Sequence, residues 1–491
     1  MALFSSALLI LCFPRFNLTW LAPVALAPLL VAVARELRPR RRFLLGWVAG
    51  FVYWFGVCYW IQIVLAVHGG MSVGQAWAMF VLFCVAKGLH MGCFALLAGI
   101  LMRRWWAVPA VSALWVAVEV THGPLGFAWL ALGNAGVDMG IPMRLVPFTG
   151  VYGLSFVFAM MSAALALAML RRPRLELVWL APILLLILLP AMPPAETGHE
   201  AALLVQSDIS ETQEWTSETL SQTLREQAAL TLRGALQHVP HAPSILVWPE
   251  VPAPYYYEDD PRFRDFTDNL ARMSNAYLLL GTVSHPASLA PLNSAELIAP
   301  SGVAVSRYDK VNLVPFGEYV PWPFDYLASK VSSEVGDFAA GKRVVVSPVG
   351  SHAEGTFICY ESVFPNFVRK FAANGADVLF NISNDGWFGQ SAARPQHLNI
   401  VRMRAAENRR WILRSTNNGI TAAIDPAGRV RGTLPPNTRA AYYANFNYIS
   451  AKTIYTQFGD WFAILCALLT TLCLVASALP AAGKGIGTDQ R

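Results

Sequence analysis

Long apolar segments constrain this chain more than any other feature. A helix needs about 20 mostly apolar residues to cross the roughly 30 Å hydrocarbon layer of a membrane. Six segments meet that length and two shorter ones fit inside a bundle: 16–34, 44–66, 73–101, 148–170, 175–193 and 459–480, with 2–13 and 105–121 as the shorter two. Since 55% of the residues are hydrophobic and only 14% are charged, an ordinary soluble enzyme is excluded. The sequence predicts a polytopic α-helical membrane bundle with about eight spans.

Clusters of arginine set the orientation of these spans. Counted in chain order, the second, fourth and sixth apolar segments are each followed by such a cluster, at residues 35–42, 103–104 and 171–174. All three clusters therefore face the same side of the membrane. Because basic loops are retained in the cytoplasm, that side is predicted to be cytoplasmic. The formal charge of +6 is then explained by topology, and no nucleic-acid partner is indicated.

The same topology divides the chain into four parts. Residues 1–193 hold seven spans, 194–458 form a polar domain on the outer face, 459–480 make the last span, and 481–491 return to the cytoplasm. The proline-rich run PAMPP marks the start of the outer domain. At roughly 260 residues, that domain is large enough to bury its own core.

The outer domain alternates helical and strand-like patterns. Helices are predicted near 215–237, 262–275, 364–373 and 394–410, and strands at 244–250, 276–283, 295–300, 302–310, 355–361, 377–384 and 411–418. Near-continuous apolar strands interleaved with helices are typical of sheets that helices cover. We therefore expect a layered α/β fold for this domain.

The placement of the cysteines singles out one thiol. Six of the seven lie in apolar segments, where they are expected to pack as small apolar side chains: Cys12, Cys58, Cys84, Cys93, Cys466 and Cys473. Cys359 is alone in the outer domain, which is predicted to face an oxidising compartment, and so it has no disulfide partner there. Such a thiol is either tolerated because it is buried or kept because it reacts.

Three chemically suited residues stand at the ends of predicted strands. Glu250 closes LVWPE, Lys310 closes VSRYDK, and Cys359 lies in TFICYE just before a helix. A thiol attacks only after losing its proton, and Glu250 is a candidate general base for it. An oxyanion formed at a carbonyl needs donors, which Lys310 and the backbone N–H of Tyr360 supply. Taken singly, such residues are more often surface charges or packing groups.

The segments around these residues resemble one superfamily. WPE, YDKVNLVPFGEYVP, ICYESVFP and NISNDGWFG follow one another as the motifs of the nitrilase, or carbon–nitrogen hydrolase, superfamily do. Membrane spans on both sides of the domain narrow the resemblance to a membrane branch, the apolipoprotein N-acyltransferases. The resemblance implies an αββα sandwich and a catalytic triad in which Glu250 is the base, Lys310 the electrostatic stabiliser and Cys359 the nucleophile.

The resemblance also implies the reaction and its surroundings. The thiol of Cys359 takes an acyl chain from a phospholipid, with phosphatidylethanolamine as the expected donor, and passes it to the N-terminal amine of a diacylglyceryl-apolipoprotein. This is the last step of bacterial lipoprotein maturation, and no cofactor is expected. Glu318, Tyr360 and Glu361 are implied to support the triad. The enzyme is expected in the bacterial inner membrane, with its catalytic domain on the periplasmic face.

Aromatic residues near these motifs are candidates for substrate contact: Trp215, Phe316, Tyr319, Trp387 and Phe388. For Trp215, packing at the start of a helix is an equally good explanation. Trp387 and Phe388 either pack a turn or form a wall of an acyl pocket. Asn384 and Asp385, which precede them, are interpreted as turn formers.

Two segments of the outer domain are expected to meet its surroundings. The aromatic run 321–331 is predicted to dip into the membrane interface. The basic run 402–410 is interpreted as a solvated helix face.

Ionisable residues inside predicted spans raise a functional question. Lys87 and His90 are three apart on one helix face, and Glu119 lies toward the outer end of another span. Pairing within the bundle, without a transport role, is the expected explanation. In the outer domain, His397 lies near Arg394, but no second His or Cys stands at metal-ligand spacing, and so no metal is indicated.

Two rival functions share parts of this pattern. A membrane-anchored amidase would hold the same triad and give its thioester to water. A transporter or scaffold would use the outer domain only to bind lipid or lipoprotein. Formation of an N-acylated peptide separates an acyltransferase from the first rival, and loss of acylation on replacing Cys359 separates it from the second.

Overall fold

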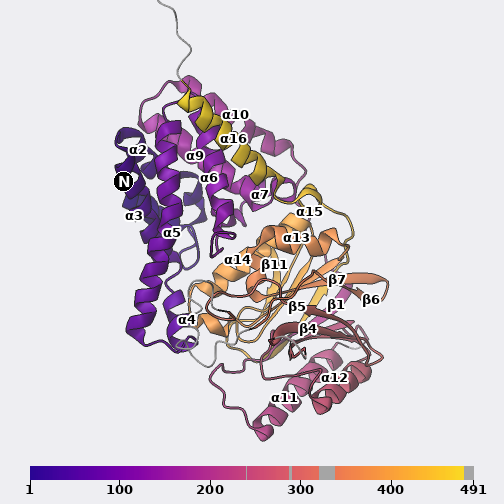
Figure 1. The fold of residues 1–491 in the computed structure, drawn as a ribbon. Coiled ribbons are helices and arrows are strands. Elements are labelled where there is room, and N and C mark those ends of the chain that lie inside the picture. Colours follow the sequence, from indigo (N-terminus) through magenta and orange to yellow (C-terminus); the bar gives the residue numbers. More distant parts are fainter. Residues whose placement is uncertain (239, 287–289, 320–337, 480–491) are drawn as a thin grey trace, which may run out of the picture.

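The computed structural model describes residues 1–238, 240–286, 290–319 and 338–479. The aromatic run 321–331 and the tail 481–491, with their predicted interfacial and cytoplasmic positions, lie outside the described residues. The described part consists of a bundle of helices and a domain built on two sheets (Figure 1).

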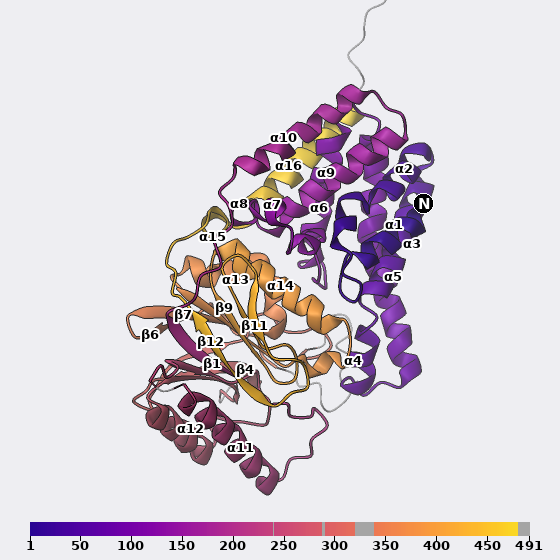
Figure 2. The same ribbon diagram turned by 180° about the vertical axis from the view of Figure 1, so that it is seen from behind.

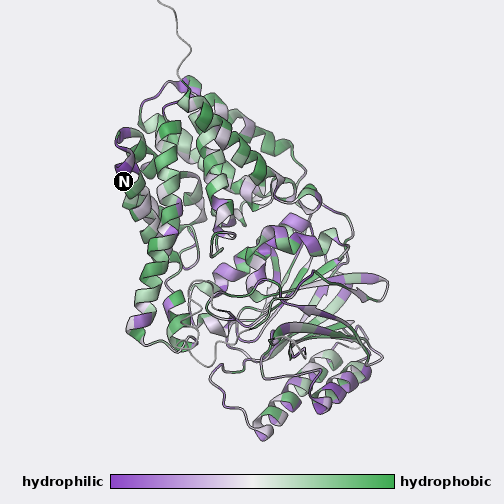
Figure 3. Cartoon of the chain, in the orientation of Figure 1, coloured by the Kyte–Doolittle hydropathy of each residue, from purple (hydrophilic) through white to green (hydrophobic). Residues whose placement is uncertain are grey.

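The bundle combines the N-terminal helices with the last one. Its α-helices and 3₁₀-helices (η) up to residue 193 are α1 (Ala2–Leu11), η1 (Thr19–Val24), α2 (Ala27–Arg35), α3 (Pro39–Val57), α4 (Ile61–Val67), α5 (Val73–Leu101), α6 (Ala107–Glu119), η2 (Val120–His122), η3 (Leu132–Gly136), α7 (Gly140–Met143), α8 (Val146–Thr149), α9 (Val151–Met169), η4 (Arg174–Leu180), α10 (Ala181–Leu184) and η5 (Leu185–Leu188). After the sheet domain come α15 (Ile454–Phe458) and α16 (Trp461–Ala478). Because α16 packs against α6, the two sets of helices form one body. Apolar residues dominate it, whereas the sheet domain is mixed (Figure 3).

Three helices of the described residues are long and apolar enough to cross a membrane: α5, α9 and α16. A fourth span results if α3 and α4, which bend by 57°, are counted as one. The predicted span 175–193 is irregular and consists of 3₁₀ and short α turns, because Pro182 at the start of α10 interrupts the hydrogen-bond ladder. The structure thus confirms an apolar helical bundle, while the count of eight spans stays a prediction.

The described residues of the sheet domain form two six-stranded sheets. In spatial order, the first contains β12 (Ala440–Phe446), β1 (Glu200–Gln206), β2 (Ile245–Val247), β3 (Tyr277–Ser284), β4 (Leu292–Ile298) and β5 (Ala304–Asp309). The second contains β11 (Val430–Thr433), β10 (Ala422–Ile424), β9 (Ile412–Thr416), β8 (Val378–Ser383), β7 (His352–Ile358) and β6 (Val346–Val349). Helices α11 (Ser217–Leu236) and α12 (Pro261–Ser274) cover the first sheet, and α13 (Pro365–Ala373) and α14 (Ala393–Asn408) cover the second (Figure 1). The predicted αββα sandwich is confirmed.

Each sheet has a parallel centre. β1, β2 and β3 run parallel in the first sheet, as do β7, β8 and β9 in the second. Their residues are almost all buried, because helices cover one face of each sheet and the other sheet covers the opposite face. The loops that follow β2, β5 and β7 carry Glu250, Lys310 and Cys359.

Five strands were not predicted from the sequence. β6, β10 and β11 have only three or four residues, too few for a periodic pattern to show. β1 and β12 pair antiparallel from opposite ends of the domain. Because the paired residues are more than 230 positions apart, no turn or hairpin pattern in the sequence indicates that these strands pair.

Helix α14 departs most from the sequence expectation. The basic run 402–410 is mostly buried, because α14 lies between the second sheet and the bundle (Figure 2). Arg404 is 1% exposed and pairs with Glu407 at 2.8 Å. Glu407 Oε1 also accepts the backbone N–H of Val151, at the start of α9, at 2.9 Å. The expected solvated face is therefore wrong, and the polar groups of this helix join the domain to the bundle.

Gly281 of β3 lets the loop of Glu250 lie directly on the first sheet. A Cβ atom at this position would lie 2.5 Å from Val251 N and 2.6 Å from Pro249 O. Gly281→Ala is therefore expected to lower the free energy of unfolding by about 1–3 kcal/mol, since backbone has to shift. Thermal unfolding of the purified protein measures this. Gly74→Ala is the control, because a Cβ there meets nothing within 4 Å, and equal melting temperatures for the two variants would contradict the prediction.

Candidate active site

A buried lysine between two carboxylates forms the centre of the site. Lys310 Nζ donates to Glu250 Oε1 at 3.0 Å and to Glu318 Oε1 at 2.8 Å. Asn293 Nδ2 donates to the same two oxygens, each at 2.8 Å. The backbone N–H of Asn384 donates to Glu250 Oε2 at 2.8 Å. Both oxygens of Glu250 are thus hydrogen-bonded, as burial of a charge requires.

Cys359 occupies an unusual turn directly after β7. It begins η7 (Cys359–Val363) with a φ of 48°, a left-handed conformation that residues with side chains rarely adopt. The residue is 7% exposed, and the hydroxyl of Ser383 lies close enough to act on its thiol. Glu250 and Lys310 lie close enough for both charges to act on the thiol. The fold therefore brings the three strand-end residues together.

Burial and charge set the protonation of these side chains. Burial raises the pKa of the Cys359 thiol far above its usual value, and the charge of Glu250 raises it further, against the opposing effect of Lys310. Burial alone would lower the pKa of Lys310, but Glu250 and Glu318 outweigh burial and hold that pKa well above its usual value. At neutral pH, the resting site pairs a protonated lysine with a neutral thiol.

Glu361 ties the loops of Lys310 and Cys359 together. Its buried carboxylate accepts the backbone N–H of Val311, the residue after Lys310, at 2.8 Å. It also accepts the backbone N–H of Ile358, the residue before Cys359, at 2.8 Å. Burial raises the pKa of Glu361 to about 7. Glu361, two residues after Cys359, therefore holds the loop of Lys310 and the loop of Cys359 together through one carboxylate.

A second charged network holds the backbone of Cys359. Arg414 Nη2 donates to Asp385 Oδ2 at 2.6 Å, and Asp385 Oδ1 lies 3.1 Å from His397 Nδ1. His397 Nε2 donates to the carbonyl of Cys359 at 3.1 Å. Burial opposes ionisation of Asp385, but Arg414 and His397 outweigh it and hold its pKa well below the usual value. Burial, together with the charge of Arg414, lowers the pKa of His397.

Most members of this network were not predicted from the sequence. Asn384 is a turn former as predicted, since its side chain accepts the N–H of Gly386 at 3.4 Å. Asp385 begins the turn η8 (Asp385–Phe388), but its carboxylate also has a role that was not predicted, because it is fully buried in an ion pair with Arg414. Arg414 inside the apolar strand WILRSTNN is the signal that could have revealed the pair, since a buried charge needs a buried partner. Asn293, inside the strand LNSAELI, is a second missed residue with the same signal.

Tyr360 and Phe388 bring the site against the membrane bundle. The ring of Tyr360 stacks on Phe127, with 5.6 Å between ring centroids. Phe388 packs edge-on against Trp60 at 5.0 Å and against Trp129 at 5.8 Å. Two neighbours of the triad therefore pack directly on residues from the apolar helical region.

The remaining aromatic candidates lie in different places. Trp387 is half-buried and stacks with His68 of the bundle, with 4.5 Å between ring centroids. Phe316 donates its backbone N–H to the carbonyl of Tyr319 at 2.7 Å, in the turn that carries Glu318. Trp215 packs on the core beneath α11 and α12, as its packing explanation expects.

The side chains of the site supply a thiol, a carboxylate and an ammonium group. Among the described residues, no group of three or more His, Cys, Asp or Glu side chains is arranged to hold a metal ion. A carboxylate beside a thiol can remove its proton, and an ammonium group can stabilise a developing oxyanion. The arrangement suits nucleophilic attack on a carbonyl carbon.

The high pKa of the Cys359 thiol makes its reactivity steeply dependent on pH. Alkylation by iodoacetamide follows the thiolate fraction, and so its rate is expected to rise about tenfold per pH unit up to pH ~9, without a plateau. Glu250→Gln removes a repulsive charge and is expected to shift this rise to lower pH. Mass mapping of the Cys359 peptide measures the rate, with Cys359→Ala as the blank. A plateau near neutral pH in the unmodified protein would contradict the assignment.

Two family models match the chain. A carbon-nitrogen hydrolase model matches residues 203–451, which hold the two sheets. A model of the apolipoprotein N-acyltransferase N-terminal domain matches residues 5–164, which hold most of the bundle.

Curated relatives match over nearly the whole length. An apolipoprotein N-acyltransferase of Geobacter metallireducens is 32% identical, over 95% of this chain and 92% of that protein. One from Pseudomonas syringae pv. tomato is also 32% identical, over 94% of each chain. Among solved structures, an amidase from Nesterenkonia sp. is 18% identical, over 54% of this chain and 94% of the amidase, with a TM-score of 0.40. The chain belongs to the apolipoprotein N-acyltransferase family, within the carbon–nitrogen hydrolases.

Proposed function

We propose that this enzyme moves an acyl chain from a phospholipid to the N-terminal amine of a diacylglyceryl-cysteine on an apolipoprotein. The observation that carries the proposal is the position of Cys359. It lies beside the buried pair of Lys310 and Glu250, and its neighbour Tyr360 packs on the apolar bundle. A lipid ester held in the bilayer, with phosphatidylethanolamine as the expected donor, suits that place.

In the first half-reaction, Cys359 attacks the ester carbonyl of the phospholipid. Glu250 accepts the thiol proton as the S–C bond forms, which is needed because burial keeps the thiol neutral. Lys310 and the backbone N–H of Tyr360 stabilise the oxyanion. When the C–O ester bond breaks, Glu250 returns the proton to the leaving alcohol. A lysophospholipid departs and a thioester stays on Cys359.

In the second half-reaction, the amine of the apolipoprotein attacks the thioester. Glu250 takes a proton from the nitrogen as the C–N bond forms, and the C–S bond then breaks as the sulfur of Cys359 regains a proton. An amide is more stable than a thioester, and so this step runs downhill. The product is a triacylated lipoprotein.

The residues around the triad are assigned positioning and substrate-facing roles. Glu318 shares Lys310 with Glu250, and Glu361 fixes the two loops on either side of the thiol. Trp387 and Phe388, which pack on residues of the bundle, and Phe316 and Tyr319, in the turn of Glu318, are proposed to hold the acyl chain and limit access of water to the thioester.

We also propose a topology for the enzyme. Residues 1–193 are assigned seven spans, 194–458 the periplasmic catalytic domain, 459–480 the eighth span and 481–491 a cytoplasmic tail. The arginine clusters that follow alternate apolar segments support this orientation in a bacterial inner membrane.

Replacing the nucleophile tests the function. Cys359→Ser is expected to lower transfer by more than about 100-fold, because a serine hydroxyl is a far weaker nucleophile beside the same base. The assay incubates purified protein with phosphatidylethanolamine and a diacylglyceryl-cysteine peptide, and it measures N-acylated peptide by mass. Cys93→Ser, at an exposed cysteine of α5, is the matched control and is expected to keep its activity.

Two outcomes would contradict the proposal. Free fatty acid without N-acylated peptide from the unmodified enzyme would indicate the rival amidase. Undiminished acylation by Cys359→Ser would show that another group carries the acyl chain.

A further inference from the structure

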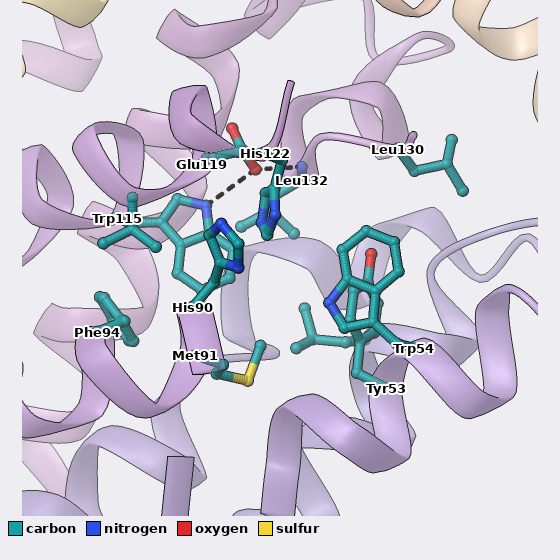
Figure 4. A pocket seen from close by; sticks show the side chains of 12 residues that line it. Tyr53, Trp54, His90, Met91, Phe94, Trp115, Glu119, His122, Leu130 and Leu132 are labelled. Carbon is teal, nitrogen blue, oxygen red and sulfur yellow. Dashed lines mark hydrogen bonds between the residues drawn. The ribbon is translucent and has the colours of Figure 1, made fainter. Parts of the chain in front are cut away.

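A group of ionisable side chains lies inside the helical bundle, and Lys87 and Glu119 of this group are buried. His90 of α5, Glu119 of α6 and His122 of η2 line a cavity of about 30 Å³ (Figure 4). Lys87, one turn before His90, places its Nζ 2.7 Å from His122 Nδ1. Lys87 is therefore paired within the bundle, as predicted, whereas neither ring nitrogen of His90 has a hydrogen-bond partner among the described residues. A cavity of this size holds about one water-sized molecule, which is too little for a lipid headgroup.

Two of these side chains hold the ends of one chain segment, residues 127–132. At one end, Lys87 Nζ donates to the carbonyl of Phe127 at 3.0 Å. At the other, Glu119 Oε1 accepts the backbone N–H of Leu132 at 2.7 Å (Figure 4). Residues 127–131 belong to no helix or strand, and so their position depends on such contacts.

Between its two ends, segment 127–132 contacts Tyr360, the residue after Cys359, and Gln396 of α14. The backbone N–H of Ala128 donates to the hydroxyl of Tyr360 at 3.2 Å, and that hydroxyl lies 3.3 Å from the carbonyl of Ala128. Trp129 Nε1 donates to Gln396 Oε1 at 2.8 Å. Gln396 precedes His397, whose ring holds the carbonyl of Cys359.

We propose that Lys87 and Glu119 are positioning residues for acyl transfer, which act through segment 127–132 on Tyr360. The proposal rests on the proposed function, in which the backbone N–H of Tyr360 stabilises the oxyanion. Neither side chain touches substrate in this account. The membrane bundle then sets the geometry of the catalytic turn as well as anchoring the enzyme.

Loss of either hydrogen bond is expected to be costly inside a bundle. A buried carbonyl or N–H that loses its partner keeps the full cost of desolvation. Without Lys87, the carbonyl of Phe127 loses its side-chain donor and the segment is free to shift. A displacement of about 1 Å at a catalytic group can lower a rate by as much as about 100-fold.

A double-mutant cycle tests the coupling. Lys87→Met removes the donor to Phe127, and Tyr360→Phe removes the hydroxyl that contacts Ala128 but keeps the backbone N–H. Each is expected to lower kcat about tenfold, with KM for the acceptor peptide changed by less than about twofold. Because both act through one segment, the double variant is expected to be at most about twofold slower than the slower single variant. Effects that multiply fully would overturn the proposal.

Two variants of Glu119 test whether its hydrogen bond to Leu132 is what matters for activity. Glu119→Gln keeps an oxygen for the N–H of Leu132 and is expected to retain kcat within about threefold, whereas Glu119→Leu is expected to match Lys87→Met. Ser112→Ala, in the same helix, is the control, because its buried hydroxyl donates to Val108 and does not reach the segment. Equal activity of Glu119→Leu and Ser112→Ala, or equal loss in both Glu119 variants, would contradict the role.

The alkylation rate of Cys359 tests the positioning role without relying on acyl transfer. If the unmodified enzyme makes no N-acylated peptide, the function fails but the position of the thiol can still be probed. Lys87→Met is expected to change the alkylation rate of Cys359 at least about threefold, while Ser112→Ala leaves it unchanged. An unchanged rate in Lys87→Met would overturn the proposal by itself.

Discussion

The burial of Lys310 between Glu250 and Glu318 is the interaction on which the rest of the site depends. Removing one partner from a buried ion pair typically costs about 3–5 kcal/mol, because it leaves a charge without compensation. The loops after β2 and β5 must therefore meet, and Asn293 of β4 supplies a donor to both carboxylates. The requirement that pairs these charges also places a base and an ammonium group beside the thiol. The contacts of Lys310 with Glu250 and Glu318 thus stabilise the fold and also position the groups beside the thiol.

Cys359 comes from the other sheet, and so its position depends on contacts between layers. Glu361 accepts the backbone N–H of Val311, which follows β5 of the first sheet, and that of Ile358, in β7 of the second sheet. His397 of α14 donates to the carbonyl of Cys359. The same helix contacts the bundle through Glu407, which accepts the first N–H of α9. The turn of Cys359 therefore lies where two sheets and the helical bundle meet.

Sequence patterns predicted the features that local chemistry determines. Glu250, Lys310 and Cys359 stood out as candidates because each ends an apolar strand, and the layered α/β class because its strands are continuous and its helices periodic. The αββα sandwich and the grouping of the three residues as a triad came from the resemblance of their motifs to the nitrilase superfamily. The network of Asp385, Arg414 and His397 was missed, since its members are far apart in sequence and a single charged residue in an apolar strand, Arg414, is its main signal. The burial of α14 was also missed. A basic run predicts a solvated helix face only when one side of the helix is exposed to solvent, and α14 is covered by the second sheet and by the bundle. The number of spans is also undecided by length and hydropathy, because prolines break some apolar segments into short turns.

An acyl thioester on Cys359 is the species that joins the geometry of the site to its proposed reaction. The most direct measurement incubates the full-length enzyme with phosphatidylethanolamine that carries a labelled acyl chain, without acceptor, and quenches it in acid. Peptide mass mapping then locates the label. The expected result is an acyl group on the Cys359 peptide that hydroxylamine removes, with an equal amount of lysophospholipid and with neither product from Glu250→Gln. Label on another residue, or transfer to an acceptor without any adduct on Cys359, would contradict the assignment.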